Sequence, residues 1–168
     1  AAQPPPDPAF STPVVEASLA APNSKNVEFV GQIGGATYAV AVQGTYAYVG
    51  VGPRLVILDV SNRAAPAVLG RTDVLPGVVQ DVAVDGHYAY VATGEAGLRI
   101  VDLADPAAPL EVGFFDTPGF ASAVARAGHY AYVADWHEGL RIIDIANPAA
   151  PTAVGSYVTP GPAYAVAL

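Results

Sequence analysis

The segment GHYAYVADWHEGLRIIDIANPAAP, residues 128–151, decides the fold because the chain carries it three times in recognisable form. The earlier copies are GHYAYVATGEAGLRIVDLADPAAP, residues 86–109, and the more divergent GTYAYVGVGPRLVILDVSNRAAP, residues 44–66. Self-similarity at a fixed period indicates a repeat architecture. Residues that recur in every copy are therefore expected to be structural, and residues confined to one copy are the better candidates for a specific function.

Each period has room for four short strands. The matching glycines Gly31, Gly70, Gly113 and Gly155 are separated by 39, 43 and 42 residues. We place the first strand of each repeat at residues 38–42, 80–84, 122–126 and 164–168. The Tyr-Ala-Tyr-Val strand and a strand such as LRIVDL follow, and a fourth strand comes after the Ala-Ala-Pro turn. A period of about 40 to 45 residues with four strands is typical of a β-propeller blade.

The predicted fold class is all-β, with about three four-stranded antiparallel blades and flanking single strands in a partial or open propeller. We divide the chain into a proline-rich leader, 1–26, and a repeat region, 27–168, with repeats at 27–69, 70–112, 113–154 and, in part, 155–168. Because strand side chains alternate between faces, each Tyr-Ala-Tyr-Val strand offers one bulky and one small face. This alternation predicts that six tyrosines pack between blades: Tyr46, Tyr48, Tyr88, Tyr90, Tyr130 and Tyr132.

Composition limits the partners of the protein. The formal net charge is −8 and Lys25 is the single lysine, so nucleic-acid binding is not expected. No apolar run approaches the roughly 20 residues that span a bilayer. Cysteine is absent, which rules out disulfides and thiolate metal sites. A hydrophobic content of 52% in 168 residues is enough for a buried core.

The N-terminal region indicates export. The chain begins AAQPPP without methionine, and small residues at a new N-terminus are what signal-peptide cleavage leaves. We therefore expect an extracellular or cell-surface location, with a sequence that was simply trimmed as the alternative. The leader is either a tether or strap lying over the domain, in which Val14 and Val15 dock on the body, or a disordered segment.

The repeat core resembles a known family. GHYAYVA followed by LRIVDLADPAAP or LRIIDIANPAAP is similar to the LVIVD repeat, a propeller-type repeat of secreted and surface proteins of bacteria and archaea. The resemblance covers about residues 27–168, although Arg63 replaces the first proline of the Asn-Pro-Ala-Ala-Pro turn in the first copy. It implies the fold and an extracellular setting, but no single activity.

The segment DWHEG, residues 135–139, is the one cluster without a counterpart, since the second copy has TGEAG there. Asp135, His137 and Glu138 have metal-binding side chains, but neighbours in sequence seldom converge on one ion. We expect instead a solvated loop or a recognition contact in which Trp136, the only tryptophan, is the anchor.

Residues that recur are expected to be structural. The repeated aspartates, Asp59, Asp102 and Asp144, should accept hydrogen bonds in turns. Arg99 and Arg141 should pair locally or extend along the surface. His87 and His129 are expected to be turn residues that lie too far apart to share a metal ion.

The channel mouth of a propeller would receive the equivalent first-strand positions Tyr38, Gln80, Ser122 and Tyr164. These side chains suit polar contacts with a partner, not acid–base catalysis, and no nucleophile elbow, phosphate loop or zinc motif is present. We therefore expect no cofactor. The leading hypothesis is a non-enzymatic extracellular or surface scaffold that binds a protein, a glycan or neighbouring subunits. The alternative is an extracellular hydrolase or lyase with a site near residues 135–138.

The number of repeats predicts an open assembly. About three and a third blades fit between residues 27 and 168, whereas closed propellers need at least four. Unpaired blade faces and strand edges are usually covered in natural proteins. We expect that the native polypeptide continues with further blades, or that other chains complete the structure.

Overall fold

The computed structural model describes residues 37–168, and this part of the chain contains twelve strands. The proposed leader at 1–26 and the expected strand at 27–31 lie outside the described residues. The strands are β1 (Thr37–Gln43), β2 (Tyr46–Val51), β3 (Arg54–Asp59), β4 (Ala67–Arg71), β5 (Asp81–Asp85), β6 (Tyr88–Ala92), β7 (Leu98–Asp102), β8 (Leu110–Phe115), β9 (Ala123–Ala127), β10 (Tyr130–Ala134), β11 (Leu140–Asp144) and β12 (Thr152–Tyr157). No helix within residues 37–168 has the length and apolar character that crossing a membrane requires.

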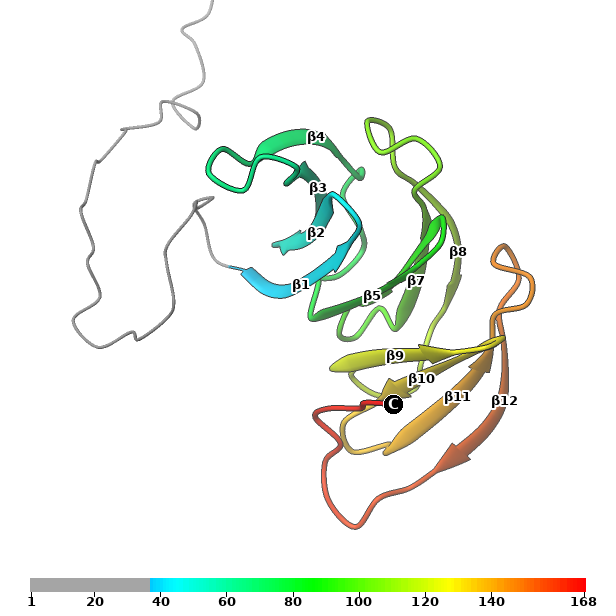
Figure 1. Cartoon of the computed structure of the whole chain (residues 1–168). Helices are drawn as coiled ribbons and strands as arrows, with labels where there is room; N and C mark the ends of the chain where they lie inside the picture. The colour runs from blue at the N-terminus through cyan, green and yellow to red at the C-terminus, as the bar shows by residue number, and fades with distance from the viewer. Residues whose placement is uncertain (1–36) are drawn as a thin grey trace, which may run out of the picture.

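The twelve strands form three antiparallel sheets of four, with the orders β1-β2-β3-β4, β5-β6-β7-β8 and β9-β10-β11-β12. Figure 1 shows the sheets fanned about a common axis like blades, with β1, β5 and β9 on the inner side and β4, β8 and β12 outside. The inner strands contact one another in succession along the chain. The predicted all-β fold of propeller blades is confirmed.

Short turns at equivalent places set the register of each blade. The first two strands of every blade are joined by two residues, of which the first is glycine: Gly44, Gly86 or Gly128. These glycines have φ between +55° and +63°, a left-handed conformation that suits glycine because it has no Cβ. His87 and His129 occupy the second turn position, as expected.

The bulky face of one blade packs on the small face of the next. Tyr48 lies in one cluster with Val82 and Val91 of the second blade, and Tyr90 lies in another with Val124 and Val133 of the third blade. Both tyrosines are buried, and this burial raises the pKa of each phenol above its ordinary value. Stacking that alternates large and small side chains fills the space between sheets without voids.

Within the described residues, this packing is missing on the faces of the first and third blades that are turned away from the second blade. Val40 of β1 is 62% exposed, whereas Val82 at the equivalent position of the second blade is 6% exposed. On the third blade, Tyr130 is 41% exposed and Tyr132 is half-buried. The prediction that all six tyrosines pack between two blades is therefore wrong for Tyr130 and Tyr132, because the described residues include no further blade over their face.

Glycines in the fourth strand allow the blades to approach closely. A Cβ on Gly70 would lie 2.5 Å from the backbone oxygen of Pro106 in the second blade. Gly113 meets the backbone oxygen of Pro148 in the third blade in the same way. The equivalent Gly155 has only Ile142 of its own blade nearby. The recurrent glycine of the fourth strand thus serves the contact with the next blade.

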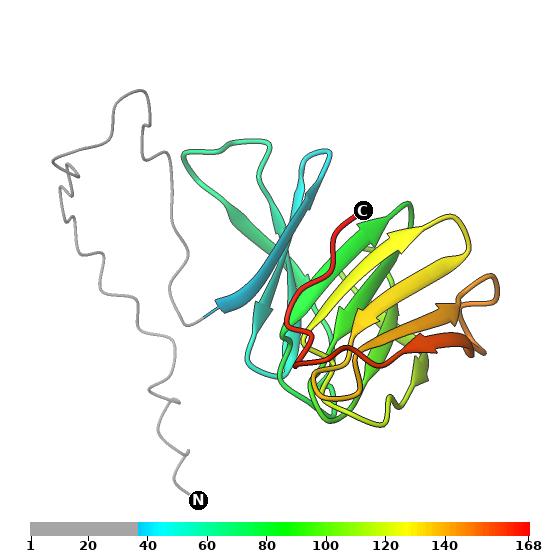
Figure 2. The same ribbon diagram turned by 90° about the horizontal axis from the view of Figure 1, so that it is seen from below.

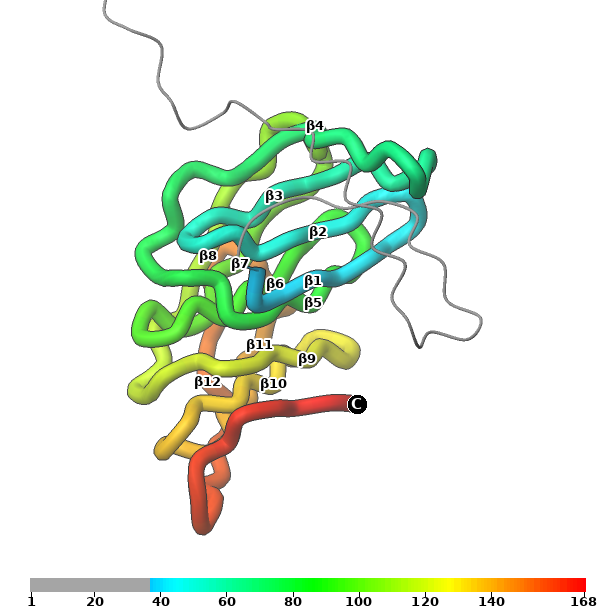
Figure 3. Tube along the Cα trace, turned by 90° about the vertical axis from the view of Figure 1, so that its left-hand side faces the viewer, coloured from blue at the N-terminus to red at the C-terminus, as the bar shows by residue number. Residues whose placement is uncertain are grey.

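The C-terminal segment passes beside the third sheet, as Figures 2 and 3 show. It is joined to the sheet by an isolated antiparallel bridge between Ala163 and Trp136. The strand predicted at residues 164–168 is not formed, since no described second strand pairs with it. The first strands predicted at 80–84 and 122–126 begin one residue later, at Asp81 and Ala123, which leaves Gln80 and Ser122 just before the ladder.

Candidate functional site

The loop between β10 and β11, residues 135–139, is held by a buried carboxylate. Asp135 is fully buried and accepts hydrogen bonds from the Thr117 hydroxyl at 2.7 Å and the Gly119 N–H at 3.1 Å. The Oδ2 atom, which accepts the hydrogen bond from Gly119, also pairs with Arg141, whose Nε lies 3.4 Å away. Asp135 therefore ties its loop to the segment that enters β9. The expectation of a solvated loop is wrong for Asp135, because its carboxylate is buried and is hydrogen-bonded by protein groups.

The two arginines that recur in the repeats pair locally, as predicted. Arg141 also binds Glu138, with 2.9 Å between Nη2 and Oε2. The equivalent Arg99 binds Asp116 at 2.7 Å and Glu111 at 3.4 Å, and its guanidinium lies 4.6 Å from the centroid of the Phe114 ring. Arg141 therefore ties the loop at residues 135–139 to β11. Arg99 connects β7 with β8 and with Asp116, and it also donates a hydrogen bond of 2.6 Å to the Ala96 carbonyl of the preceding loop.

Trp136 has an unusual backbone conformation. Its φ is +47°, and it is the one non-glycine residue with positive φ in the described part of the chain. The equivalent residue of the second blade is Gly94, with φ of +66°. A left-handed conformation costs a non-glycine residue about 1 to 2 kcal/mol. Stability alone therefore does not explain why a bulky aromatic residue occupies a backbone position that suits glycine. Backbone outliers of this kind gather at functional sites.

The backbone of Trp136 is fixed by its neighbours. Its carbonyl accepts hydrogen bonds from Gly139 N–H at 3.1 Å and from Ala163 N–H at 2.9 Å. The indole meets the Phe120 ring edge to face, with centroids 6.2 Å apart and an angle of 66° between the planes. The imidazole of His137 lies on the indole at 4.2 Å. The ring is thus held in place while remaining 40% exposed.

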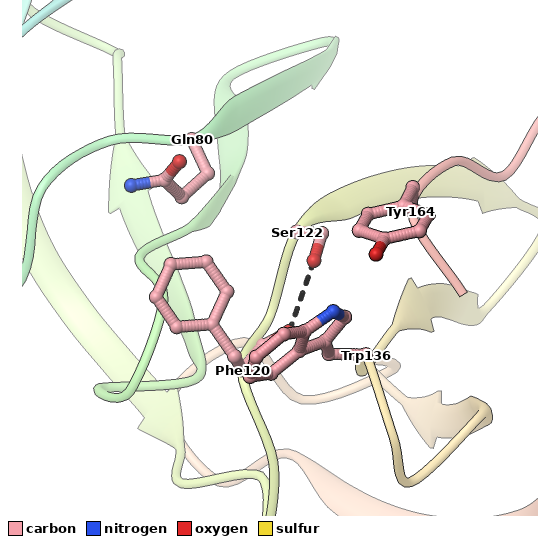
Figure 4. A pocket seen from close by; sticks show the side chains of 5 residues that line it. All are labelled: Gln80, Phe120, Ser122, Trp136 and Tyr164. Carbon is pink, nitrogen blue, oxygen red and sulfur yellow. Dashed lines mark hydrogen bonds between the residues drawn. The ribbon is translucent and has the colours of Figure 1, made fainter. Parts of the chain in front are cut away.

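A cavity of about 340 Å³ lies next to this indole and is lined by residues from successive repeats. We call it the Trp136 pocket, and its lining residues are Gln80, Phe120, Ser122, Trp136 and Tyr164. Figure 4 shows these side chains converging from different segments, with the Tyr164 ring above the indole and Gln80 on the side of Phe120. Its volume falls at the lower end of the roughly 300 to 1,000 Å³ that small-ligand pockets occupy.

Three of the four predicted channel-mouth residues meet in this pocket. Gln80, Ser122 and Tyr164 line it together with the predicted anchor Trp136. Tyr38, the fourth, belongs to β1 of the first blade and is 69% exposed outside the pocket. Equivalence between repeats therefore brings three of these four positions to one pocket, since residues in the same place on successive blades lie side by side around the axis.

Phe120 is the lining residue that the repeat pattern did not predict. It precedes β9 and follows a Pro-Gly pair that also stands before β5 and before residues 163–168, where Val78 and Pro162 are its equivalents. Its ring lies against Gly94, whose added Cβ would be 2.8 Å from the Phe120 Cε2 atom. The sequence does carry a signal for this contact. Phe120 is the largest residue at its repeat position, and it lies opposite Gly94 of the preceding blade.

The three metal candidates do not converge. Asp135 is buried among its hydrogen-bond donors, Glu138 is paired with Arg141, and His137 stacks on Trp136. Residues 37–168 contain no group of three or more His, Cys, Asp or Glu side chains that could hold a metal ion. Each of these residues has instead a structural partner that accounts for its position in the loop.

The recurrent aspartates have the structural role that the repeats predict. One carboxylate oxygen of each accepts a hydrogen bond of 2.8 Å from the N–H two residues later, which belongs to Ser61, Ala104 or Ala146. Hydrogen bonds from the side chain and the backbone of Ser61 lower the pKa of the Asp59 carboxyl. Asp59, Asp102 and Asp144 thus close the turn after the third strand.

The fold and the pocket together define a protein of β-propeller repeats. The family model described as LVIVD repeat matches residues 34–74, 76–117 and 118–159, which make up more than half of the chain. The chain belongs to the LVIVD repeat family. The chain is therefore a repeat scaffold module.

Solved structures show the same fold at low sequence identity. The computationally designed Ika4 protein is similar with a TM-score of 0.69 and 11% identity, over 86% of this chain and 88% of that one. The computationally designed Ika8 protein has a TM-score of 0.66 and 10% identity, over 79% of this chain and 40% of its own length. The search of curated proteins finds no match. At such identity the likeness concerns the fold alone.

Proposed function

We propose that the protein is a non-enzymatic scaffold, located outside the cell or on its surface, that binds a protein or glycan partner through the Trp136 pocket. The observation that carries this proposal is Trp136 itself, an exposed indole held at positive φ beside a cavity. Tryptophan is among the residues that contribute most to binding energy in interfaces. The strain at its backbone is understandable if the ring serves a ligand.

The state of the loop carboxylates supports binding over hydrolysis. A hydrolase or lyase near residues 135–138 would need an accessible acid and base. Asp135 is fully buried and its oxygens are occupied by Thr117, Gly119 and Arg141, while Glu138 is paired with Arg141. The Trp136 pocket is lined by aromatic, amide and hydroxyl groups. These groups bind and orient a partner but are poor acid–base catalysts at neutral pH.

The family supports an extracellular location, because the LVIVD repeat is typical of secreted and surface proteins. Fractionation of the native source, followed by immunodetection, tests this point. We expect the protein in the culture medium or the surface fraction, and its confinement to the cytoplasm would contradict this part of the proposal.

Partner capture tests the role of the pocket. Immobilised protein is incubated with extracellular material from the native source, and the bound components are identified by mass spectrometry and glycan analysis. We expect the Trp136→Ala variant to lose the specific partner. The matched control is Tyr38→Ala, which should bind normally. Tyr38 occupies the repeat position of Tyr164, but it is exposed and lies outside the pocket. Equal capture by wild type and Trp136→Ala would contradict the proposed function.

A further inference from the structure

The chemistry of the Trp136 pocket specifies a class of ligand more closely than the fold does. The inference below rests on the binding function proposed above. Its basis is the set of groups that three consecutive repeats present to one cavity: three aromatic rings, one amide and one aliphatic hydroxyl. None of the five side chains carries a charge at neutral pH.

The charged residues nearby are turned away from this cavity. Glu138 and His137, with Glu95, line a separate hollow on the other side, to which Phe120 and Trp136 also contribute. The Phe120–Trp136 pair therefore divides an uncharged pocket from an acidic one. Because a charged ligand in the Trp136 pocket would lose its hydration without gaining a counter-charge, the pocket favours a neutral ligand. The net charge of −8 disfavours anions further.

The polar groups of the pocket point to a ligand with hydroxyl groups. In Figure 4 the single hydrogen bond among the lining residues runs from the Ser122 hydroxyl to the Phe120 carbonyl, at 3.2 Å. The Tyr164 hydroxyl and the indole N–H both lie at the cavity, and neither is bonded to another of the residues drawn. Amide and hydroxyl groups both donate and accept. A ligand that matches them must do the same.

The aromatic groups of the pocket point to a flat ligand with an apolar face. Trp136 and Tyr164 are 40% and 67% exposed, so both rings have area available for stacking. A pyranose combines an apolar face of C–H groups with a rim of hydroxyls that donate and accept hydrogen bonds. A polyproline segment would also stack on these rings, but it lacks N–H donors and would leave the acceptor oxygens of Gln80, Ser122 and Tyr164 without partners.

We propose that the Trp136 pocket is a subsite for one neutral pyranose unit of an oligosaccharide or polysaccharide. Trp136 is the stacking platform, Phe120 supports it from the side, and Gln80, Ser122 and Tyr164 bind the hydroxyl rim. In the second blade, Gly94 occupies the place of Trp136 and provides no platform, but it leaves room for the Phe120 ring. The loop at residues 135–139 thus supplies the stacking platform, which the equivalent loop of the second blade lacks.

The experiment uses the full chain and its single tryptophan as the reporter. Fluorescence excited at the indole is recorded during titration with cellohexaose, mannohexaose and laminarihexaose, with hexagalacturonate as the anionic probe and decaproline as the peptide probe. We expect at least one neutral hexasaccharide to shift the emission and to show saturable heat in calorimetry. We expect hexagalacturonate and decaproline to do neither.

Variants locate the site. Calorimetry with the neutral sugar that binds best should show about tenfold or weaker affinity for Trp136→Ala, the usual effect of losing an aromatic anchor. Gln80→Ala should weaken binding roughly fivefold, because one hydrogen-bonding group is lost. Tyr38→Ala should bind as the wild type does. All variants are first checked for cooperative thermal unfolding, and Trp136→Tyr, which keeps a ring, should retain part of the affinity.

Two results separate this inference from the function on which it rests. If no neutral sugar binds, or only hexagalacturonate or decaproline does, the sugar subsite is overturned, although partner capture that depends on Trp136 would leave the binding function intact. If neutral sugars bind equally to wild type and Trp136→Ala, the sugar site lies elsewhere and the inference is also overturned. Loss of Trp136 dependence in partner capture would contradict the proposed function itself.

Discussion

The loops between the second and third strands of the second and third blades have the same backbone but different chemistry. Both bridge to the segment that follows the fourth strand of their own blade, Gly94 to Ala121 and Trp136 to Ala163. Both contain left-handed residues at matching places, and the N–H of the first loop residue bonds to the carbonyl of the last, at 2.9 Å in one and 2.7 Å in the other. The side chains alone differ. A repeated backbone can therefore be kept while one copy is adapted for binding.

The anchoring of the two loops differs in the same way. In the second blade, the Thr93 hydroxyl donates a hydrogen bond of 2.9 Å to the Gly97 carbonyl within the loop. In the third blade, Asp135 reaches outside the loop to Thr117, Gly119 and Arg141. The loop that carries Trp136 is thus anchored by a buried carboxylate to the segment before β9, which suits a preformed site.

The largest expected effect concerns the packing of equivalent tyrosines. Tyr90 is buried between the second and third blades, whereas Tyr132 at the matching position of the third blade is half-buried. We expect Tyr90→Ala to lower the free energy of unfolding by about 4 kcal/mol, the range for large aromatic residues in a core. Tyr132→Ala should cost less than half as much. Chemical denaturation measures both, and equal losses would contradict the assignment of the two faces.

Asp135 provides the next largest contrast. Asp135→Ala leaves the Thr117 hydroxyl, the Gly119 N–H and Arg141 without their acceptor, and we expect a loss of about 3 kcal/mol in unfolding free energy. Glu138→Gln is the control, because Glu138 pairs with the same arginine but is exposed, and such pairs contribute about 1 kcal/mol or less. A small effect of Asp135→Ala would show that the carboxylate does not anchor the loop.

Close approach between blades is tested at two equivalent glycines. A side chain at Gly113 would collide with the backbone of Pro148 and Ala149 in the third blade, while a Cβ at Gly155 would make only ordinary contacts with Ile142 of its own blade. Gly113→Ala should therefore destabilise by about 2 kcal/mol through overpacking. Gly155→Ala should change stability by under about 0.5 kcal/mol. If thermal and chemical unfolding rank the two variants in the opposite order, the blade contact is misassigned.

The smallest expected effect isolates the backbone strain at Trp136. Trp136→Gly and Trp136→Ala lose the same ring contacts, but only alanine keeps a Cβ at positive φ, so the glycine variant should be more stable by about 1 kcal/mol. In β8 the order should reverse, with Phe114→Ala more stable than Phe114→Gly, because glycine weakens a strand. Urea denaturation of the four variants gives the comparison. Greater stability of Trp136→Ala over Trp136→Gly would remove the case for strain.

The sequence predicted the blades because their determinants are local and repeated. The Gly-X turns, the Tyr-Ala-Tyr-Val alternation and the aspartate turns each act within a few residues, and three copies reinforce the pattern. The number of repeats predicted an unpaired blade face, but the tyrosine pattern did not show that Tyr130 and Tyr132 lie on it, because the same Tyr-Ala-Tyr-Val sequence occurs in every blade. The strand predicted at residues 164–168 is not formed, because a strand needs a partner as well as a suitable sequence.

The candidate site was predicted in part. Equivalence between repeats brought Gln80, Ser122 and Tyr164 to one place, and the non-repeated Trp136 identified the loop. The burial of Asp135 and the contribution of Phe120 could not be foreseen, because both depend on the distance between blades. The side-chain types at residues 135–139 suggested metal ligands. In the structure, Asp135 and Glu138 instead form ion pairs with Arg141, and the His137 ring packs against the indole of Trp136.

Protection of the single tryptophan tests the binding role of the Trp136 pocket most directly. The rate at which acrylamide quenches the indole fluorescence is measured for the free protein and for the protein saturated with the partner captured from extracellular material. The account predicts that the exposed indole is quenched readily in the free protein and is shielded in the complex. An unchanged quenching constant at saturation would show that the partner binds without covering Trp136 and would contradict the account.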